Sequence, residues 1–281
     1  MSGNKSRPAC LCGGSVWKKV FSYDRPPQGE NLFGFSKRGS YSREVFCCQN
    51  CGHFISAHCM DEAALYNGEY VNSAYGDKQG ILQAFTKINA LDDSRSDNAG
   101  RVRRICEFAG RFFSPERFKD RKPSILDVGS GLCVFLYRMK SAGWEGTALD
   151  PDPRAIEHAQ KNVGVTGICA DFTTAKNLGS YDAIAFNKVL EHIKDPVAVL
   201  SRSAEFLKRG GFVYVELPDG EAAVTEGPGR EEFFIEHHHI FSMSSFALLA
   251  SQSGFMALFI ERLREPSGKF TLRGCLTLKA K

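Results

Sequence analysis

Two pairs of closely spaced cysteines near the N-terminus have the residue type and spacing of a metal site. "ACLCGG" holds Cys10 and Cys12, and "CCQNCGH" holds Cys48 and Cys51. A glycine follows each pair and permits the tight turn that such a knuckle requires. Four thiolates form a closed, structural zinc site, and the alternative is a metal-free loop. We expect zinc on Cys10, Cys12, Cys48 and Cys51, with Cys47, His53, His58 and Cys59 as possible substitutes.

A second group of residues has the spacing of a nucleotide-binding turn. The segment "SILDVGSGLC" contains Asp127, Gly129 and Gly131, and the next apolar run ends at Asp150. The glycines let the backbone approach a ligand closely, and a carboxylate at Asp150 can accept hydrogen bonds from both hydroxyls of a ribose. A dinucleotide fingerprint requires a third glycine where this chain has Val134. Asp127 suits a cationic sulfonium ligand, so the pattern favours S-adenosylmethionine over a dinucleotide.

Three consecutive histidines, His237 to His239, stand in "EEFFIEHHHIFS". In an extended segment successive side chains face opposite sides, so this run does not form a metal site, and at most His237 and His239 share a side. Histidine accepts a proton near neutral pH, which makes a catalytic base the alternative to a surface loop. His192 in "LEHI" is either a second pocket residue or a packing residue at a helix start.

The elements that would position these residues alternate between strand and helix patterns. The apolar runs "SILDV", "GTALD", "GICAD", "YDAIAFN" and "FVYVELP" are separated by amphipathic segments such as "VFLYRMKSAG" and "PVAVLSRSAEFLKRGG". Such alternation predicts an α/β fold with a parallel sheet wound on both faces, a Rossmann-like arrangement. "FMALFIERL" and "FTLRGCLTLKA" are joined only by a turn and predict a terminal hairpin, so one terminal strand is antiparallel. Ligands of such sheets bind at the carboxyl ends of the strands.

Residues 101–281 resemble the class I S-adenosylmethionine-dependent methyltransferases. "LDVGSGLC" is similar to their first motif, with Cys133 where a third glycine is usual, and "ALDPDP" resembles their ribose-binding turn. "ADF" resembles the adenine-contacting loop, and "FNKVLEHIKDP" resembles the motif that lines the methyl-donor pocket. The resemblance implies a cofactor site formed by Asp127, Gly129, Ser130, Gly131, Asp150, Pro151, Asp171, Phe172, Asn187 and Lys188.

With its cysteine-rich N-terminus, the chain resembles the members that act on nucleotide-linked or surface-glycan sugars. These carry an "EH" pair after the fifth strand, to which "IEHHHIFS" is similar, whereas "YNGEYVNSAYGD" (66–77) matches their linker only loosely. The resemblance implies a small-molecule sugar acceptor, with His237 as the base, His239 as second choice and Glu236 orienting the base or contacting a hydroxyl. His192 is a further candidate. The expected domains are a zinc-binding segment (1–65), a linker or helical lid (66–100) and the methyltransferase domain (101–281).

Composition narrows the class of partner. With 281 residues, 43% of them hydrophobic, the chain can bury a full core. The formal charge of +4 includes no basic run, which counts against an RNA base methyltransferase, the main alternative function. A non-enzymatic binding module is disfavoured by the intact glycine and aspartate motif. We expect no membrane segment and no signal peptide, and hence a cytoplasmic protein whose clustered thiols bind metal.

Overall fold

A seven-stranded sheet forms the centre of the computed structural model, which describes residues 10–31, 41–58 and 78–279. Its strands are β4 (Ser124–Val128), β5 (Glu145–Asp150), β6 (Thr166–Cys169), β7 (Tyr181–Asn187), β8 (Leu207–Pro218), β10 (Phe255–Arg264) and β11 (Phe270–Leu278). They lie in the order β10-β11-β8-β7-β4-β5-β6. Strands β4 to β8 are parallel, and β11 runs antiparallel to both β8 and β10. The predicted Rossmann-like sheet with its antiparallel terminal hairpin is confirmed.

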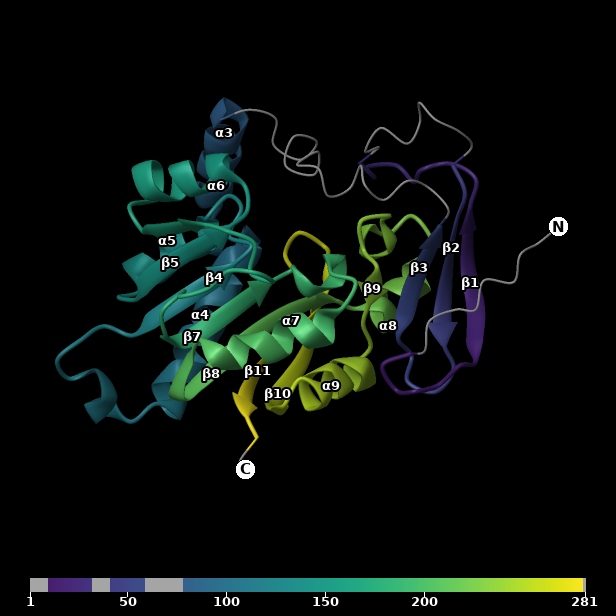
Figure 1. Ribbon diagram of the computed structural model, residues 1–281. Coiled ribbons are helices and arrows are strands. Elements are labelled where there is room, and N and C mark those ends of the chain that lie inside the picture. Colours follow the sequence, from purple (N-terminus) through teal and green to yellow (C-terminus); the bar gives the residue numbers. More distant parts are fainter. Residues whose placement is uncertain (1–9, 32–40, 59–77, 280–281) are drawn as a thin grey trace.

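Helices cover both faces of this sheet (Figure 1). They are α3 (Lys78–Asn89), α4 (Asp97–Phe112), α5 (Val134–Ser141), α6 (Pro153–His158), α7 (Pro196–Arg202) and α9 (Met243–Gln252), whereas α8 (Gly220–Ala223) packs against the N-terminal sheet. Neighbouring residues of β4 separate the two cores, because successive side chains of a strand face opposite sides. Ile125 belongs to the core shared with α4 and α5, and Leu126 to the core shared with α7 and α9.

Local sequence signals set the ends of two helices that flank the site. Helix α4 begins after Ser96, whose side chain accepts a hydrogen bond from the N–H of Ala99, and it ends just before Phe113. Helix α9 begins after Ser242, which forms a reciprocal capping box with Ser245. These caps satisfy backbone donors that a helix start leaves unpaired. Helix α4 starts four residues before Arg101, the expected start of the methyltransferase domain.

A separate antiparallel sheet packs against the carboxyl side of the main domain (Figure 1). Strands β1 (Trp17–Tyr23), β2 (Arg43–Cys48) and β3 (Phe54–His58) come from the N-terminal region, and β9 (His239–Ile240) from the C-terminal half. Their core includes Val45 and Phe54 from the N-terminal region and Phe233 and Ile240 from the main domain.

These strands have no signal in the sequence, because the cysteine pairs indicated only a knuckle. The expected boundary between residues 65 and 66, the segment 66–77 and Cys59 lie outside the described residues. Within the described part of the chain, every helix is too short or too polar to cross a membrane.

Candidate active site

The glycine turn after β4 leaves room for a ligand at the carboxyl edge of the sheet. Gly129 has φ +70° and Gly131 has φ +46°, a region that favours glycine. A Cβ atom at Gly129 would lie only 2.8 Å from a methyl group of Val189. Cys133, where a third glycine is usual, also has a positive φ of 57° and is fully buried. The turn is therefore shaped by positions where a side chain is strained or excluded.

Asp150 lies at the end of β5, and its hydrogen bonds connect the glycine turn after β4 with the turn after β5. Its two carboxylate oxygens accept hydrogen bonds from the N–H of Gly131 and the N–H of Asp152, each at 2.9 Å. The side chain is 7% exposed, and burial raises the pKa of its carboxyl. Each carboxylate oxygen has a second acceptor site, so Asp150 retains the capacity to accept two ligand hydroxyls.

Buried polar atoms without partners mark the space beside Asp150. Asn187, at the end of β7, donates its Nδ2–H to Oδ1 of Asp127 at 2.7 Å. The Oδ1 of Asn187 and the Oγ of Ser130 are buried and have no hydrogen-bond partner among the described residues. Burial raises the pKa of Asp127 to about 7. Buried polar groups are normally paired, so these atoms fit a site that binds a polar ligand.

The two residues of the expected adenine loop, Asp171 and Phe172, differ in exposure. Asp171 is exposed, and its Oδ1 accepts hydrogen bonds from the N–H and hydroxyl of Thr173. Phe172 is only 4% exposed, and its ring contacts Phe186 and Phe206. The aromatic ring thus belongs to the core beneath the loop rather than to its surface, because the loop turns inward directly after β6. Pro151 is exposed at the end of β5.

A pocket lies over the ends of β7 and β8 and the start of β11, next to the glycine turn. We call it the carboxyl-edge pocket. Its lining consists of Lys188, Glu191, His192, Pro218, Glu231, Glu232, Phe234, Glu236, His237, Lys269 and Phe270. Lys188 follows Asn187 directly, so the pocket meets the end of β4, which holds Asp127, where β7 and β4 pair. Burial lowers the pKa of the Lys188 ammonium and raises the pKa of Glu236 to about 7.

His192 and His237 meet inside this pocket, with ring centroids 4.9 Å apart. The Nδ1 atom of His192 lies 2.9 Å from the carbonyl oxygen of Glu236, and that of His237 lies 2.8 Å from the carbonyl oxygen of Glu232. Burial lowers the pKa of His192 to about 4 and holds the pKa of His237 well below its usual value. Both rings are therefore neutral at pH 7.

His239 has different surroundings, because the backbone bends at His238 before strand β9 begins at His239. The expected extended run through all three histidines is therefore interrupted, and a turn in which the N–H of His237 donates to the carbonyl of Phe234 precedes it. His239 does not line the pocket: its Nδ1 lies 3.0 Å from Nε2 of His53, and its Nε2 lies 3.2 Å from the carbonyl of Lys194. Alternation of side chains fails because it requires extended backbone.

The four predicted cysteines lie together at one end of the N-terminal sheet. One sulfur from each of Cys10, Cys12, Cys48 and Cys51 lies within 4.8 Å of the others, and Cys10–Cys51 and Cys12–Cys48 are 3.4 and 3.5 Å apart. Gly13 and Gly52 have φ values of 75° and 71°, which are the tight turns expected from the sequence.

The surroundings of the cysteine cluster act differently on its thiols. Burial raises the pKa of Cys10 and raises that of Cys51 to about 11. Burial also raises the pKa of Cys48, but the N–H groups of Cys51 and Asn50 and neighbouring thiols lower it to about 7. Cys47 points to a different partner, the carbonyl of Cys48, and His53 is engaged with Ser245 and His239. Four clustered sulfurs are a donor set that suits a tetrahedral zinc ion.

Two buried acids were missed by the sequence reasoning. Glu191 is 1% exposed beside His192, and Glu216 in β8 is fully buried. Glu216 accepts hydrogen bonds from Arg101 at 2.5 Å and from the hydroxyl of Tyr214 at 2.6 Å. The letters "LEH" contain Glu191, but only the fold shows that it is enclosed.

A sheet of this order, with a glycine turn and an acidic strand end at its carboxyl edge, defines a class I methyltransferase fold. The sequence profile of the family described as "Methyltransferase domain" matches residues 98–258, more than half of the chain. The chain belongs to this family of methyltransferase domains.

Curated relatives and solved structures agree with this assignment. The ubiquinone biosynthesis O-methyltransferase of Escherichia coli O157:H7 is 28% identical over 164 residues, which are 56% of this chain and 61% of that protein. The chain thus spans about three fifths of the length of this relative.

Two solved structures are similar in fold. One is the 1,6-didemethyltoxoflavin N1-methyltransferase of Burkholderia thailandensis, with a TM-score of 0.54 and 14% identity over 83% of this chain and 98% of that one. The other is the magnesium protoporphyrin IX methyltransferase of Synechocystis PCC 6803, with a TM-score of 0.58 and 13% identity over 78% and 100%. Both contain bound S-adenosylhomocysteine.

Proposed function

We propose that the chain transfers a methyl group from S-adenosylmethionine to a small polar acceptor bound in the carboxyl-edge pocket. The observation that carries the proposal is the adjacency of two sites along one sheet edge. The glycine turn and Asp150 lie at the ends of β4 and β5. The carboxyl-edge pocket lies at the ends of β7 and β8 and the start of β11. They meet where the order of strands reverses, which is where ligands of such sheets bind.

The residues beside the glycine turn would hold the cofactor. Asp150 would accept hydrogen bonds from the ribose hydroxyls, and Asp171 would contact the adenine amino group. When bound, S-adenosylmethionine supplies a reactive methyl group on a sulfonium sulfur. The backbone at Gly129 and Ser130, and Asn187 and Lys188 at the end of β7, would align that group with the pocket. Alignment of two reactants accounts for a large share of such catalysis, about 7–11 kcal/mol at its limit.

In the pocket, His237 is the candidate for accepting a proton from an acceptor hydroxyl. Its Nδ1 lies against a backbone carbonyl, so the lone pair is on Nε2. Glu236 would orient the acceptor, and the ring of His192 would support that of His237. His239 has no place in this mechanism, because its ring nitrogens bond to His53 and Lys194 outside the pocket.

For the acceptor we propose a nucleotide-linked or surface-glycan sugar. The support is the resemblance of "IEHHHIFS" to sugar methyltransferases and the number of charged side chains that line the pocket. The named activities of the similar proteins are all methylations of small molecules. An RNA acceptor would require a basic surface for the backbone phosphates, and the net charge of only +4 gives it little support. We further propose that Cys10, Cys12, Cys48 and Cys51 hold a structural zinc ion.

The proposed function is tested by measuring cofactor affinity and methyl transfer in one variant pair. In Asp150→Asn the shape is kept but the carboxylate charge is lost, so calorimetry should show S-adenosylmethionine binding weakened about tenfold or more. Asp195→Asn, which alters only the cap of helix α7, should bind like the unchanged protein. Labelled methyl should pass to nucleotide-linked sugars and not to RNA. Equal affinities in the two variants would remove the ribose assignment.

A further inference from the structure

Three potential metal ligands converge in the carboxyl-edge pocket, apart from the cysteine cluster. Glu191 and His192 follow β7, and His237 follows β8 from the other side of the pocket. One ligand atom from each lies within 4.8 Å of the other two. With bonds of about 2.1 Å, two ligands on opposite sides of an ion are about 4.2 Å apart. A small inward movement of these side chains therefore completes three positions of a coordination shell.

Backbone carbonyls orient both imidazoles for such a role. His192 donates its Nδ1–H to the carbonyl of Glu236, and His237 donates its Nδ1–H to the carbonyl of Glu232. In each ring this arrangement leaves the lone pair on Nε2. Metal-bound histidines usually have the same support, a hydrogen bond from the second ring nitrogen that fixes the tautomer and the plane of the ring. The two rings, whose centroids are 4.9 Å apart, thus have the tautomer that metal binding through Nε2 requires.

Glu191 supplies the negative charge. Its side chain is buried, and Oε2 has no hydrogen-bond partner among the described residues. A buried carboxylate oxygen without a partner is costly, and a cation would satisfy it. The other acids nearby are engaged: Glu231 pairs with Lys269 at 3.0 Å, and Glu232 pairs with Arg230 at 2.8 Å. The Oε2 of Glu236 is also buried without a partner among the described residues, but Glu191 is the carboxylate that lies within 4.8 Å of both imidazoles.

The protonation states agree with a ligand role. Burial lowers the pKa of His192 to about 4 and that of His237 well below its usual value, so both rings are neutral at pH 7. A general base works best with a pKa near the operating pH, whereas a metal ligand must only be neutral.

We propose that Glu191, His192 and His237 bind one divalent metal ion, which holds an oxygen atom of the acceptor in the carboxyl-edge pocket. Two imidazoles and one carboxylate suit borderline ions such as zinc, iron, cobalt or manganese and leave positions open for substrate. The part about the acceptor rests on the proposed function, whereas ion binding does not. His237 uses the same Nε2 lone pair in either role, so the bound ion takes the place of the base.

Manganese titration tests the site in the whole, folded protein. Thiolates prefer softer ions than Mn²⁺, so added Mn²⁺ should bind to the pocket site and not to the cysteine cluster. Electron paramagnetic resonance of free Mn²⁺ should show one saturable site per chain. Its affinity should fall about tenfold or more in Glu191→Gln and His192→Ala. His238→Ala, a neighbour that does not line the pocket, should bind Mn²⁺ like the unchanged protein. Pulsed electron paramagnetic resonance should detect imidazole nitrogen bound to the Mn²⁺ ion.

The outcomes separate the metal site from the methyl transfer. Calorimetry of S-adenosylmethionine and thermal melting on the same samples report whether each variant is folded. The proposal is overturned if Mn²⁺ does not saturate a site, or if both Glu191→Gln and His192→Ala bind it normally. Methyl transfer that persists in a chelator would then support His237 as a base. Mn²⁺ bound without any methyl transfer would keep the metal site and remove the proposed function.

Discussion

His237 and His239 are two positions apart, yet their surroundings give them different chemistry. His237 lies in the carboxyl-edge pocket beside His192, whereas His239 bonds to His53 and to the carbonyl of Lys194. The backbone bend at His238 separates the directions of their side chains. The chemistry available in the pocket thus depends on which histidine side chain points into it.

The first prediction at this scale concerns turnover. His237→Ala should lower kcat by about 10²–10⁴-fold, because the variant loses the group that accepts a proton or holds an ion. His238→Ala should change kcat little, and S-adenosylmethionine affinity should be the same in both variants. Steady-state kinetics and calorimetry provide the measurements. Equal and mild losses in both would mean that the run only shapes the wall of the pocket.

Residue spacing predicted the cofactor turn better than the acceptor pocket. Gly129 and Gly131 were predicted because a close ligand approach restricts the residue type, and Asp150 because it ends a strand. Glu191 was missed because its burial arises from segments far apart in the sequence, those of β7 and β8. The ring of Phe172 is buried, and its expected place at the cofactor stays a prediction. A short motif predicts where the backbone turns, but it does not predict which way the neighbouring side chains point.

At the scale of elements, the short strand β9 links the N-terminal sheet to the pocket. It pairs with β3 through Phe54–Ile240 and Ile55–His239 and follows His237 by a single residue. Ser242, at the start of α9, donates a hydrogen bond to the carbonyl of Cys51. The cysteine cluster therefore stabilises the strand that anchors one wall of the carboxyl-edge pocket.

This link predicts a selective effect of zinc loss. Cys48→Ser should lower the zinc content from about one ion per chain and loosen β2 and β3. Because β9 then loses its partner, acceptor turnover should fall about tenfold or more, while S-adenosylmethionine affinity stays unchanged. Metal analysis, kinetics and calorimetry test the three parts. Cys47→Ser, whose thiol lies outside the cluster, should keep its zinc and its activity; a zinc-free Cys47→Ser protein would contradict the assignment of ligands.

The strands of the main sheet were predictable, and those of the N-terminal sheet were not. Five apolar runs alternating with helices fix a parallel sheet, because crossover connections allow few other arrangements. β1 has a single buried residue, Tyr23, and its sheet is completed by β9 from nearly two hundred positions away. Such a pairing has no local signature. The sheet shares its core with Phe233 and Ile240, so its stability depends on residues that no N-terminal pattern includes.

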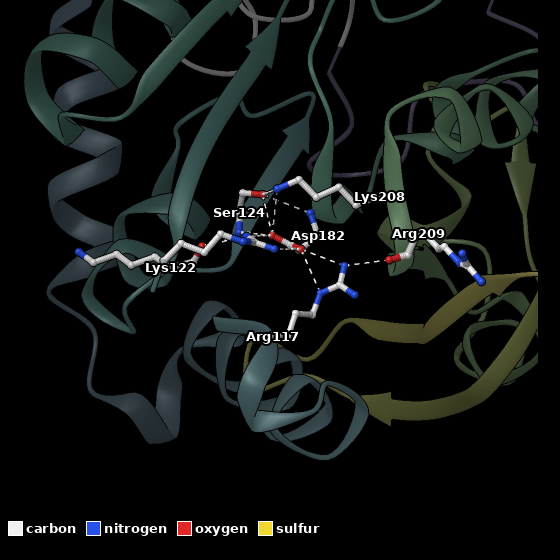
Figure 2. A network of polar contacts seen from close by, with 7 residues as sticks. Arg117, Lys122, Ser124, Asp182, Lys208 and Arg209 are labelled. Atoms are coloured by element: carbon white, nitrogen blue, oxygen red, sulfur yellow. Dashed lines mark hydrogen bonds and ion pairs between the residues drawn. The ribbon is translucent and has the colours of Figure 1, made fainter. Parts of the chain in front are cut away.

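At the scale of the whole molecule, the two edges of the main sheet carry different charge arrangements. The carboxyl edge holds the unpartnered polar atoms of the candidate site. At the amino edge, Asp182 of β7 is fully buried and pairs with Arg117, Arg121 and Lys208, and with Ser124 of β4 (Figure 2). Its hydrogen bonds are all made within the chain, so this cluster stabilises the fold and leaves nothing for a ligand.

The last prediction follows from that cluster. Burial raises the pKa of Asp182, but hydrogen bonds from Arg121, Ser124 and Arg117 lower it by more, so the pKa lies well below its usual value. A carboxyl with a lowered folded-state pKa stabilises the protein above its unfolded pKa, and this contribution is lost as the pH falls toward the folded value. Asp182→Asn should therefore reduce the free energy of unfolding at pH 7 by on the order of 3 kcal/mol. This is the low end for a broken buried pair, because the arginines are partly exposed.

The difference between Asp182→Asn and the unchanged protein should shrink as the pH is lowered below about 4, where the native carboxylate begins to lose its advantage over the unfolded chain. Urea unfolding at several pH values measures this trend. Asp120→Asn changes an exposed aspartate in the segment that carries Arg117 and Arg121, and this variant should unfold like the unchanged protein at every pH. S-adenosylmethionine affinity should be equal in all three proteins, because Asp182 lies at the edge opposite the glycine turn. A pH-independent difference would mean that Asp182 acts through packing rather than charge.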